Sequence, residues 1–168
     1  MRWIPIFAIA TLSACAEKAP PPEPETGGGP VPSAVPPTAD IEALALDAEV
    51  AELRSYPVQL RGTLRVTNPT DRTIRFDVGG CPVFLRVYDA AGEPVWDQGD
   101  GAVCTMILRT VTLDPGATET FQTSTSSASD ILGEEHPDGT YRVGVYLALV
   151  EGGQPEASAR EVELAIPR

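Results

Sequence analysis

The stretch Ile74–Trp96, IRFDVGGCPVFLRVYDAAGEPVW, decides the fold class. In its first part apolar residues alternate with charged ones, and a similar alternation resumes after Pro82. A period of two places successive side chains on opposite faces of a strand, so each part predicts a half-buried β-strand. We expect Gly79–Gly80 to break the chain between the two strands. Asp89–Gly92 predicts a hairpin turn into a short return strand, Glu93–Trp96.

Further short strands are predicted on both sides of this stretch. Upstream, Leu44–Leu53 fits either a strand or a short helix rich in Ala and Leu, and we favour the strand. Polar residues make Ser124–Asp138 the longest expected loop. The remaining strand candidates are Leu60–Val66, Cys104–Leu113, Thr118–Thr123, Gly139–Val150 and Arg160–Ile166. About seven to nine short strands with no long helical pattern predict an all-β protein, an antiparallel β-sandwich of immunoglobulin-like type.

The N-terminus has the pattern of an export signal. Trp3–Leu12 is an apolar run that is too short for a membrane-spanning helix, which needs about 20 residues. It ends in Leu12-Ser13-Ala14-Cys15, which resembles the bacterial lipobox. The resemblance implies that residues 1–14 are a signal peptide, cleaved before Cys15, and that Cys15 is acylated. The alternative is an ordinary signal peptide followed by an incidental cysteine.

The residue after the lipidated cysteine indicates whether a lipoprotein is sorted to the inner or the outer membrane. Ala16 stands there instead of Asp, and in a Gram-negative cell this pattern favours the outer membrane. The protein is therefore expected to be exported and lipid-anchored to the cell envelope, facing the periplasm in such a cell. Two or three acyl chains on one residue would hold it stably in the bilayer.

Residues 15–39 predict a disordered tether. The segment is rich in Pro and Gly, has no aromatic residue and has almost no large aliphatic one. It cannot bury enough apolar area to offset the entropy lost on ordering. Residues 40–168 are then the folded β-sandwich domain, and with 168 residues in all the chain has room for one such domain and a tail.

The composition narrows the classes of partner and of function. The formal net charge is -12, which opposes binding to nucleic acids and to anionic lipid headgroups. No Gly-x-Ser-x-Gly motif is present, and His136 is the only histidine. Asp97–Gly101 lacks the alternating ligands of a calcium loop. We therefore expect no enzyme, no catalytic residue, no cofactor and no metal site.

Two of the three cysteines remain after Cys15 is assigned to lipidation. Cys81 starts one predicted strand and Cys104 starts another, and a disulfide between them is chemically permitted after export. On the chain-entropy model, closing a loop of this length would stabilise the fold by about 3 kcal/mol. The alternatives are two buried thiols or a metal pair, for which only His136 could supply a third nitrogen or sulfur ligand.

Four short motifs follow one another along the domain: LRVTNPTDRTI (64–74), VYDAAGEPVW (87–96), LDPGAT (113–118) and DGTYRV (138–143). In this order they resemble the BsuPI domain, the intracellular proteinase inhibitor family first described in Bacillus. The resemblance covers about Val58–Leu149. The chain departs from the family at Gly79–Pro82, where an uncharged polar turn is usual, and at Cys104, where a Phe is usual.

The resemblance implies a binding module that inhibits a proteinase by placing a rigid loop in its cleft. Candidate loops are the turn Asn68–Thr73, with Arg72 for a trypsin-like pocket, and the segment from Trp96 through Asp97 and Asp100 to Val103. The alternative is a structural or accessory envelope lipoprotein that docks another envelope protein through a sheet edge. The expected partners are a proteinase or such an envelope protein, together with the bilayer through acylated Cys15.

Overall fold

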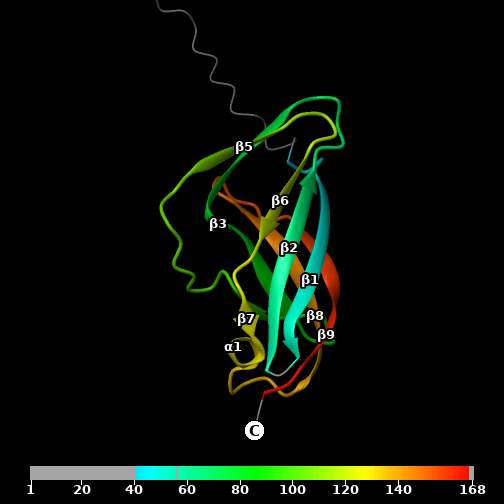
Figure 1. The fold of residues 1–168 in the computed structure, drawn as a ribbon, viewed down its shortest axis with the longest axis vertical. Coiled ribbons are helices and arrows are strands. Elements are labelled where there is room, and N and C mark those ends of the chain that lie inside the picture. Colours follow the sequence, from blue (N-terminus) through cyan, green and yellow to red (C-terminus); the bar gives the residue numbers. More distant parts are fainter. Residues whose placement is uncertain (1–40, 56, 167–168) are drawn as a thin grey trace, which may run out of the picture. The chain divides into compact units, whose positions relative to one another are not determined.

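The computed structural model describes residues 41–55 and 57–166. In these described residues, nine strands form two antiparallel sheets, and one short helix lies between β7 and β8 in the chain (Figure 1). One sheet has the order β1-β2-β6, with β7 also paired to β2; the other has the order β4-β3-β8-β9, with β5 also paired to β3. The elements are β1 (Ala45–Ser55), β2 (Val58–Thr67), β3 (Ile74–Tyr88), β4 (Pro94–Asp97), β5 (Arg109–Leu113), β6 (Thr118–Gln122), β7 (Ser126–Ser127), α1 (Ala128–Leu132), β8 (Gly139–Leu149) and β9 (Glu156–Leu164). The predicted all-β sandwich is confirmed.

Alternating residues of the two sheets form one hydrophobic core. In β2 every second residue is buried, and in both halves of β3 the apolar members of the alternating pattern point inward. Burying a Val or Leu side chain contributes about 1.5–3 kcal/mol, so this face supplies most of the favourable folding free energy. The core side chains with no exposed surface include Leu60, Leu64, Val66, Val78, Leu85, Val87, Val143, Val145, Leu147 and Leu164.

The ambiguous segment Leu44–Leu53 lies in strand β1 from Ala45 onward, as we favoured. β1 pairs along its length with β2, from Ala45 opposite Thr67 to Ser55 opposite Val58. Because β2 has a buried, fully alternating face, it provides a template for the less regular sequence of β1.

Three expectations about local structure were wrong. Gly79–Gly80 does not end a strand, because β3 runs through it to Tyr88. Cys104–Leu108 is not part of a strand; only Arg109–Leu113 pairs, with β3. The expected loop Ser124–Asp138 contains β7 and α1, whose first turn is closed by a capping box between Ser127 and Asp130.

The signal peptide, the acylated Cys15 and the tether predicted for residues 1–39 lie outside the described residues. Within the part that the structure describes, no helix is long and apolar enough to cross a bilayer.

Candidate functional site

The candidate site begins at an irregularity in the middle of β3. Val78 lies opposite Leu149 of β8, but Val83 lies opposite Leu147, so the register shifts between the two pairs. Four residues of β3, Gly79–Pro82, therefore face a single residue of β8. Such a bulge frees backbone from the ladder and redirects side chains at a sheet edge.

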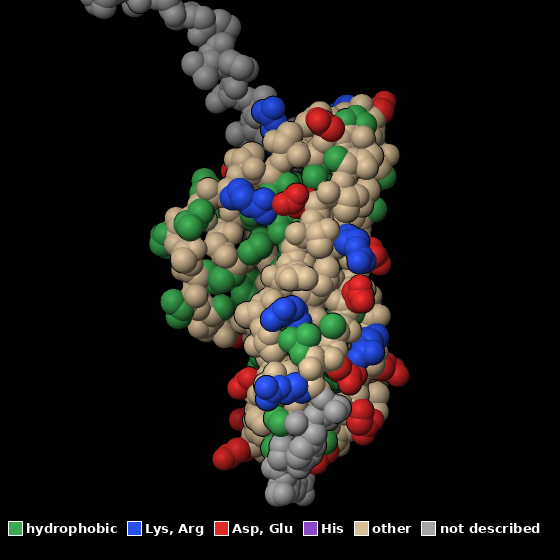
Figure 2. Space-filling model, viewed as in Figure 1, with side chains coloured by type: hydrophobic (Ala, Val, Ile, Leu, Met, Phe, Trp, Pro, Cys, Tyr) green, Lys and Arg blue, Asp and Glu red, His purple; other side chains and the backbone are tan. Residues whose placement is uncertain are grey.

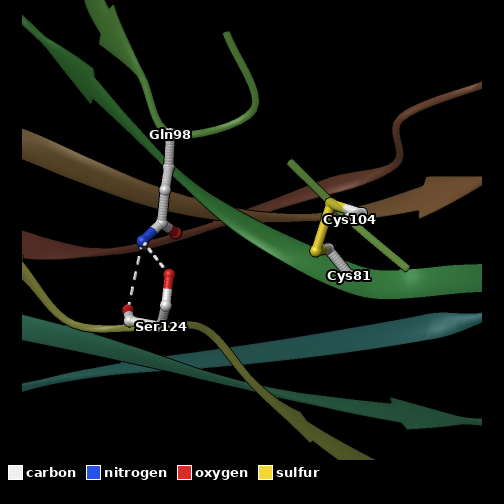
Figure 3. Close-up of a disulfide and its surroundings, with 4 residues drawn as sticks. All are labelled: Cys81, Gln98, Cys104 and Ser124. Atoms are coloured by element: carbon white, nitrogen blue, oxygen red, sulfur yellow. Dashed lines mark hydrogen bonds between the residues drawn. A yellow bond between two sulfur atoms is a disulfide. The ribbon is translucent and has the colours of Figure 1, made fainter. Parts of the chain in front are cut away.

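Cys81 in this bulge forms a disulfide with Cys104, as the sequence predicted. The two Cα atoms are 5.6 Å apart. Figure 3 shows that the bond joins β3 to the chain that follows β4. The disulfide therefore ties the middle of the segment between β4 and β5, Gln98–Leu108, to the sheet. We call this segment the Gln98–Leu108 loop.

Gly80 allows the backbone of the loop to lie directly against β3. A Cβ atom at Gly80 would lie 2.1 Å from the hydroxyl oxygen of Thr105 and 2.6 Å from its carbonyl oxygen. No such contact is tolerated, whereas a Cβ at the neighbouring Gly79 would meet nothing within 4 Å. Thr105 is thus fixed against the strand at the residue that follows the disulfide.

Gln98 fixes the start of the loop to both sheets. Its backbone N–H donates to the carbonyl of Leu85 in β3 (2.9 Å), and its side-chain oxygen accepts from the Leu85 N–H (3.0 Å). Its side-chain amide donates to the hydroxyl and the carbonyl of Ser124 (2.9 and 3.1 Å; Figure 3). It also donates to the Ser126 hydroxyl (2.9 Å). One side chain therefore joins the loop, β3 and the segment before α1.

Asp97, the last residue of β4, is held in a half-buried polar cluster. One carboxylate oxygen accepts two hydrogen bonds from Arg86 (2.7 and 2.9 Å), and the other accepts from the Tyr146 hydroxyl (2.7 Å) and the Gly99 N–H (2.8 Å). The side chains of Arg86 and Asp97 are only 20% and 16% exposed. Glu156 completes the cluster by pairing with Arg86 at 3.1 Å.

Burial and the neighbouring charges shift the pKa values in this cluster. Burial raises the pKa of Tyr146, and the hydrogen bond to Asp97 raises it further because only the protonated phenol can donate. Burial lowers the pKa of Arg86, but its hydrogen bonds and its attraction to Asp97 and Glu156 together raise it above its usual value. At neutral pH the Tyr146 phenol therefore stays protonated and Arg86 stays charged, so both donate hydrogen bonds to Asp97.

Beyond these anchors the loop exposes apolar side chains. Val103 and Met106 are fully exposed, at 99% and 102% of their reference areas, and Ile107 and Leu108 are 64% and 62% exposed. Figure 2 shows hydrophobic side chains on the lobe at the left of the view, which is the yellow-green loop that leads into β5 in Figure 1. Exposed apolar residues that cluster in this way mark interaction surfaces. We call Val103–Leu108 the apolar segment.

The backbone of the apolar segment is also available. The segment contains no turn, bend or helix, and none of its residues has a positive φ. Among the described residues, no backbone–backbone hydrogen bond involves Val103–Leu108. The backbone of Thr105 faces Gly80, whereas the N–H and C=O groups of Met106–Leu108 are not committed to the sheet.

The second candidate loop, the turn Asn68–Thr73, is closed on itself. The Asn68 amide nitrogen donates to the carbonyls of Arg72 (2.6 Å) and Leu113 (2.9 Å), and its oxygen accepts from the Thr70 N–H and hydroxyl (3.0 and 2.7 Å). Asn68 is fully buried, while Arg72 is exposed at the tip. The turn lies at the Leu113 end of β5, and the apolar segment joins β5 at its other end, so the two candidates are about 13 Å of strand apart.

The structure places the predicted site residues in different roles. Trp96 packs against the core from β4, and Asp97 is an ion-paired structural carboxylate. Asp100 is exposed in the turn that follows. The sequence analysis missed the apolar segment. Its signal was Met106–Leu108, three apolar residues in a row, which does not alternate as a half-buried strand does.

A comparison with protein-family models decides the family. Residues 45–152 match the model of BsuPI, described as intracellular proteinase inhibitor. The chain belongs to this family. The match includes both candidate loops, the disulfide and every strand from β1 to β8. No curated protein matches the chain in sequence.

Solved structures with a similar arrangement are distant. The putative ApaA protein from Bordetella pertussis is 18% identical, with a TM-score of 0.34, over 74% of this chain and 93% of that protein. A β-glucosidase from Listeria innocua is 12% identical, with a TM-score of 0.39, over 74% of this chain. This chain spans only 16% of the length of the glucosidase.

Metal-ligating side chains are not gathered in the described part of the domain. In residues 41–55 and 57–166, no group of three or more His, Cys, Asp or Glu side chains is placed to hold a metal ion.

Proposed function

We propose that this protein is a proteinase inhibitor of the cell envelope, and that it binds the substrate cleft of the proteinase through the apolar segment Val103–Leu108. It acts by binding and not by catalysis. The observation that carries the proposal is the exposed, unpaired backbone of this segment beside a disulfide, in a chain of the intracellular proteinase inhibitor family.

The geometry suits a proteinase cleft. A peptide in extended form can add to an exposed strand of its receptor through backbone hydrogen bonds, while pockets receive alternate side chains. The apolar segment offers both the free backbone groups and the apolar side chains that such binding needs.

The anchors explain how such a segment would inhibit without being a substrate. Gln98, the Cys81–Cys104 disulfide and the contact of Thr105 with Gly80 fix the loop before the proteinase binds. A fixed loop loses little conformational entropy on binding. If the proteinase cleaved the segment, the disulfide would hold one new end in place, which favours re-formation of the bond over release.

The proposed location rests on the lipobox-like tetrapeptide at residues 12–15 and is supported by the disulfide. Disulfides persist in oxidising compartments and are rare in the cytosol. We therefore place this member of an intracellular inhibitor family outside the cytoplasm, held by acylated Cys15 at the end of the predicted tether.

The test is a titration of serine proteinases with the full-length chain in detergent. Stoichiometric loss of activity, with the chain intact on a denaturing gel, is the expected result. A chain that is degraded, or that leaves every proteinase active at a large molar excess, would show that the proposal is wrong.

The titration also separates the alternative, an accessory lipoprotein that docks another envelope protein. That function predicts co-purification with an envelope partner and no inhibition. Inhibition that is lost when Val103, Met106, Ile107 and Leu108 are all replaced by Ser, with an unchanged melting temperature, would assign the activity to the apolar segment.

A further inference from the structure

We propose that Met106 is the side chain that enters the primary specificity pocket of the target, so the inhibitor is directed at proteinases whose pocket is deep and apolar. This inference rests on the proposed function and names its target class. It differs from the trypsin-like target that Arg72 would indicate.

The first argument is exposure. The walls of a specificity pocket contact the inserted side chain on all sides. That side chain must therefore make few contacts with its own protein before binding. In the apolar segment only Val103 and Met106 are fully exposed, whereas Ile107 and Leu108 retain contacts that cover about a third of their surface.

The second argument is support of the backbone, which distinguishes Met106 from Val103. Met106 directly follows Thr105, whose backbone lies against Gly80. Cys104, one residue earlier, is covalently tied to β3. Three residues after Met106, Arg109 enters the ladder with β3 opposite Val78. Met106 is therefore held between two fixed points.

Val103 has no comparable support on its N-terminal side. It follows Gly101, whose φ of +73° belongs to the region that glycine adopts freely, and Ala102, whose N–H donates to the Gly99 carbonyl. A glycine-rich approach loses more entropy on binding than a segment fixed at both ends.

The third argument is the chemistry of the side chain. Methionine is unbranched, flexible and polarisable, so it can reach into a deep pocket and adapt to its walls. Chymotrypsin has a hydrophobic slot at this position, whereas trypsin has an aspartate that requires a cation.

The loop offers no cation to a trypsin-like pocket. Residues 101–108 contain no charged side chain. The first cation after them, Arg109, pairs with Glu119 at 2.9 Å, and its guanidinium carbon lies 5.3 Å from the centre of the Phe121 ring. Arg109 is therefore engaged with the sheet that contains β6.

The experiment measures inhibition constants of the full-length chain against bovine chymotrypsin and trypsin. We expect chymotrypsin to be inhibited on the order of 100-fold more tightly than trypsin. In Met106→Lys we expect the preference to reverse, because the ammonium group is costly to bury in an apolar slot and pairs with the aspartate of trypsin.

Two control variants place a lysine at other exposed apolar residues, Val150 and Val103. Val150→Lys, at an exposed apolar residue after β8, should leave both inhibition constants unchanged. Val103→Lys should not transfer inhibition to trypsin. Because all three side chains are exposed, the melting temperature should stay the same in each variant, so altered folding would not explain a switch.

The outcomes are distinguishable. A reversal in Val103→Lys but not in Met106→Lys, or no reversal in either while the unaltered chain still inhibits, would overturn this inference and leave the proposed function intact. A chain that inhibits no proteinase would overturn both. Protection of Met106 from peroxide by vesicles of neutral lipid, but not by chymotrypsin, would assign the segment to a bilayer and also overturn it.

Discussion

The turn Asn68–Thr73 and the Gln98–Leu108 loop are both exposed connections on the same sandwich, yet their polar groups are used in opposite ways. In the turn, the buried Asn68 side chain bonds to backbone and hydroxyl groups around it. In the loop, the bonds are concentrated at Gln98, and the residues Val103–Leu108 make no backbone–backbone hydrogen bond.

The difference indicates how an exposed loop can be fixed while its backbone groups stay unpaired. Bonds made inside a turn stabilise the fold, but the same groups cannot then pair with a partner. The loop obtains its rigidity from a disulfide and a close backbone contact, neither of which uses the hydrogen-bonding groups of Met106–Leu108. Mutations in the two regions should therefore separate stability from binding.

Removing the disulfide should have the largest effect. We expect Cys81→Ala with Cys104→Ala to lower the free energy of unfolding by about 3 kcal/mol, because a closed loop of the unfolded chain is opened. The variant should also become a substrate cleaved within Val103–Leu108. Urea unfolding and mass spectrometry after exposure to chymotrypsin measure the two effects; an uncut, fully inhibitory variant would contradict the role of the disulfide.

Asn68→Ala should affect stability alone. It leaves the Arg72 and Leu113 carbonyls and the Thr70 N–H without their buried partner, at an expected cost of about 2 kcal/mol. Inhibition should be unchanged at a temperature where the variant is folded. Weaker inhibition by the folded variant would mean that this turn, and not the loop, contacts the proteinase.

Gly80→Ala tests the contact between the strand and the loop. The added methyl group must displace Thr105, so we expect a loss of about 1–2 kcal/mol in stability and weaker inhibition. Gly79→Ala is the matched control, since a Cβ there meets nothing within 4 Å. Equal inhibition constants for the two variants would show that the contact with Gly80 does not position the loop.

The smallest expected effect is on stability at high pH, through the Tyr146 hydroxyl that donates to Asp97 just before the Gln98–Leu108 loop. The pKa of Tyr146 is raised above its usual value of about 10 in the folded state, so above that pH the unfolded chain has lost a proton that the folded chain keeps. Stability should therefore fall as the pH rises above about 10, and half a unit above it this residue should account for a loss of less than roughly 1 kcal/mol.

Tyr146→Phe should remove that part of the slope. Urea midpoints measured at neutral and at alkaline pH for both chains give the comparison. An identical alkaline slope in the variant would show that Tyr146 does not carry the effect.

Most of the sandwich could be predicted from the sequence because its strands bury one face. Alternation such as Ile74–Phe76–Val78 is imposed by the core, so it appears directly in the residue order. Helix α1 could not be predicted in this way because Ala128–Leu132 is too short to show a helical period. The strand break expected at Gly79–Gly80 was wrong because Gly80 makes room for the backbone of Thr105. Thr105 is 25 residues away in the chain, so the local sequence does not show this contact.

The candidate site was only partly predictable. The cysteine count and the predicted export signal favoured a disulfide between Cys81 and Cys104 over free thiols or a metal pair, and the structure confirms the disulfide. The role of Asp97 depends on Arg86 and Tyr146, which only the folded sheet brings together. Met106 falls within the predicted strand Cys104–Leu113, and because apolar residues are usually buried, no local pattern reveals that its side chain is fully exposed.

The residues that fix the apolar segment differ from the residues that are proposed to contact the target. Cys104 and Arg109 bracket four residues, of which Met106, Ile107 and Leu108 lie outside the hydrophobic core. Substitutions at these three sites should therefore cost the fold little. Under the proposed function, the target could then change one exposed side chain at a time while the sandwich stays the same.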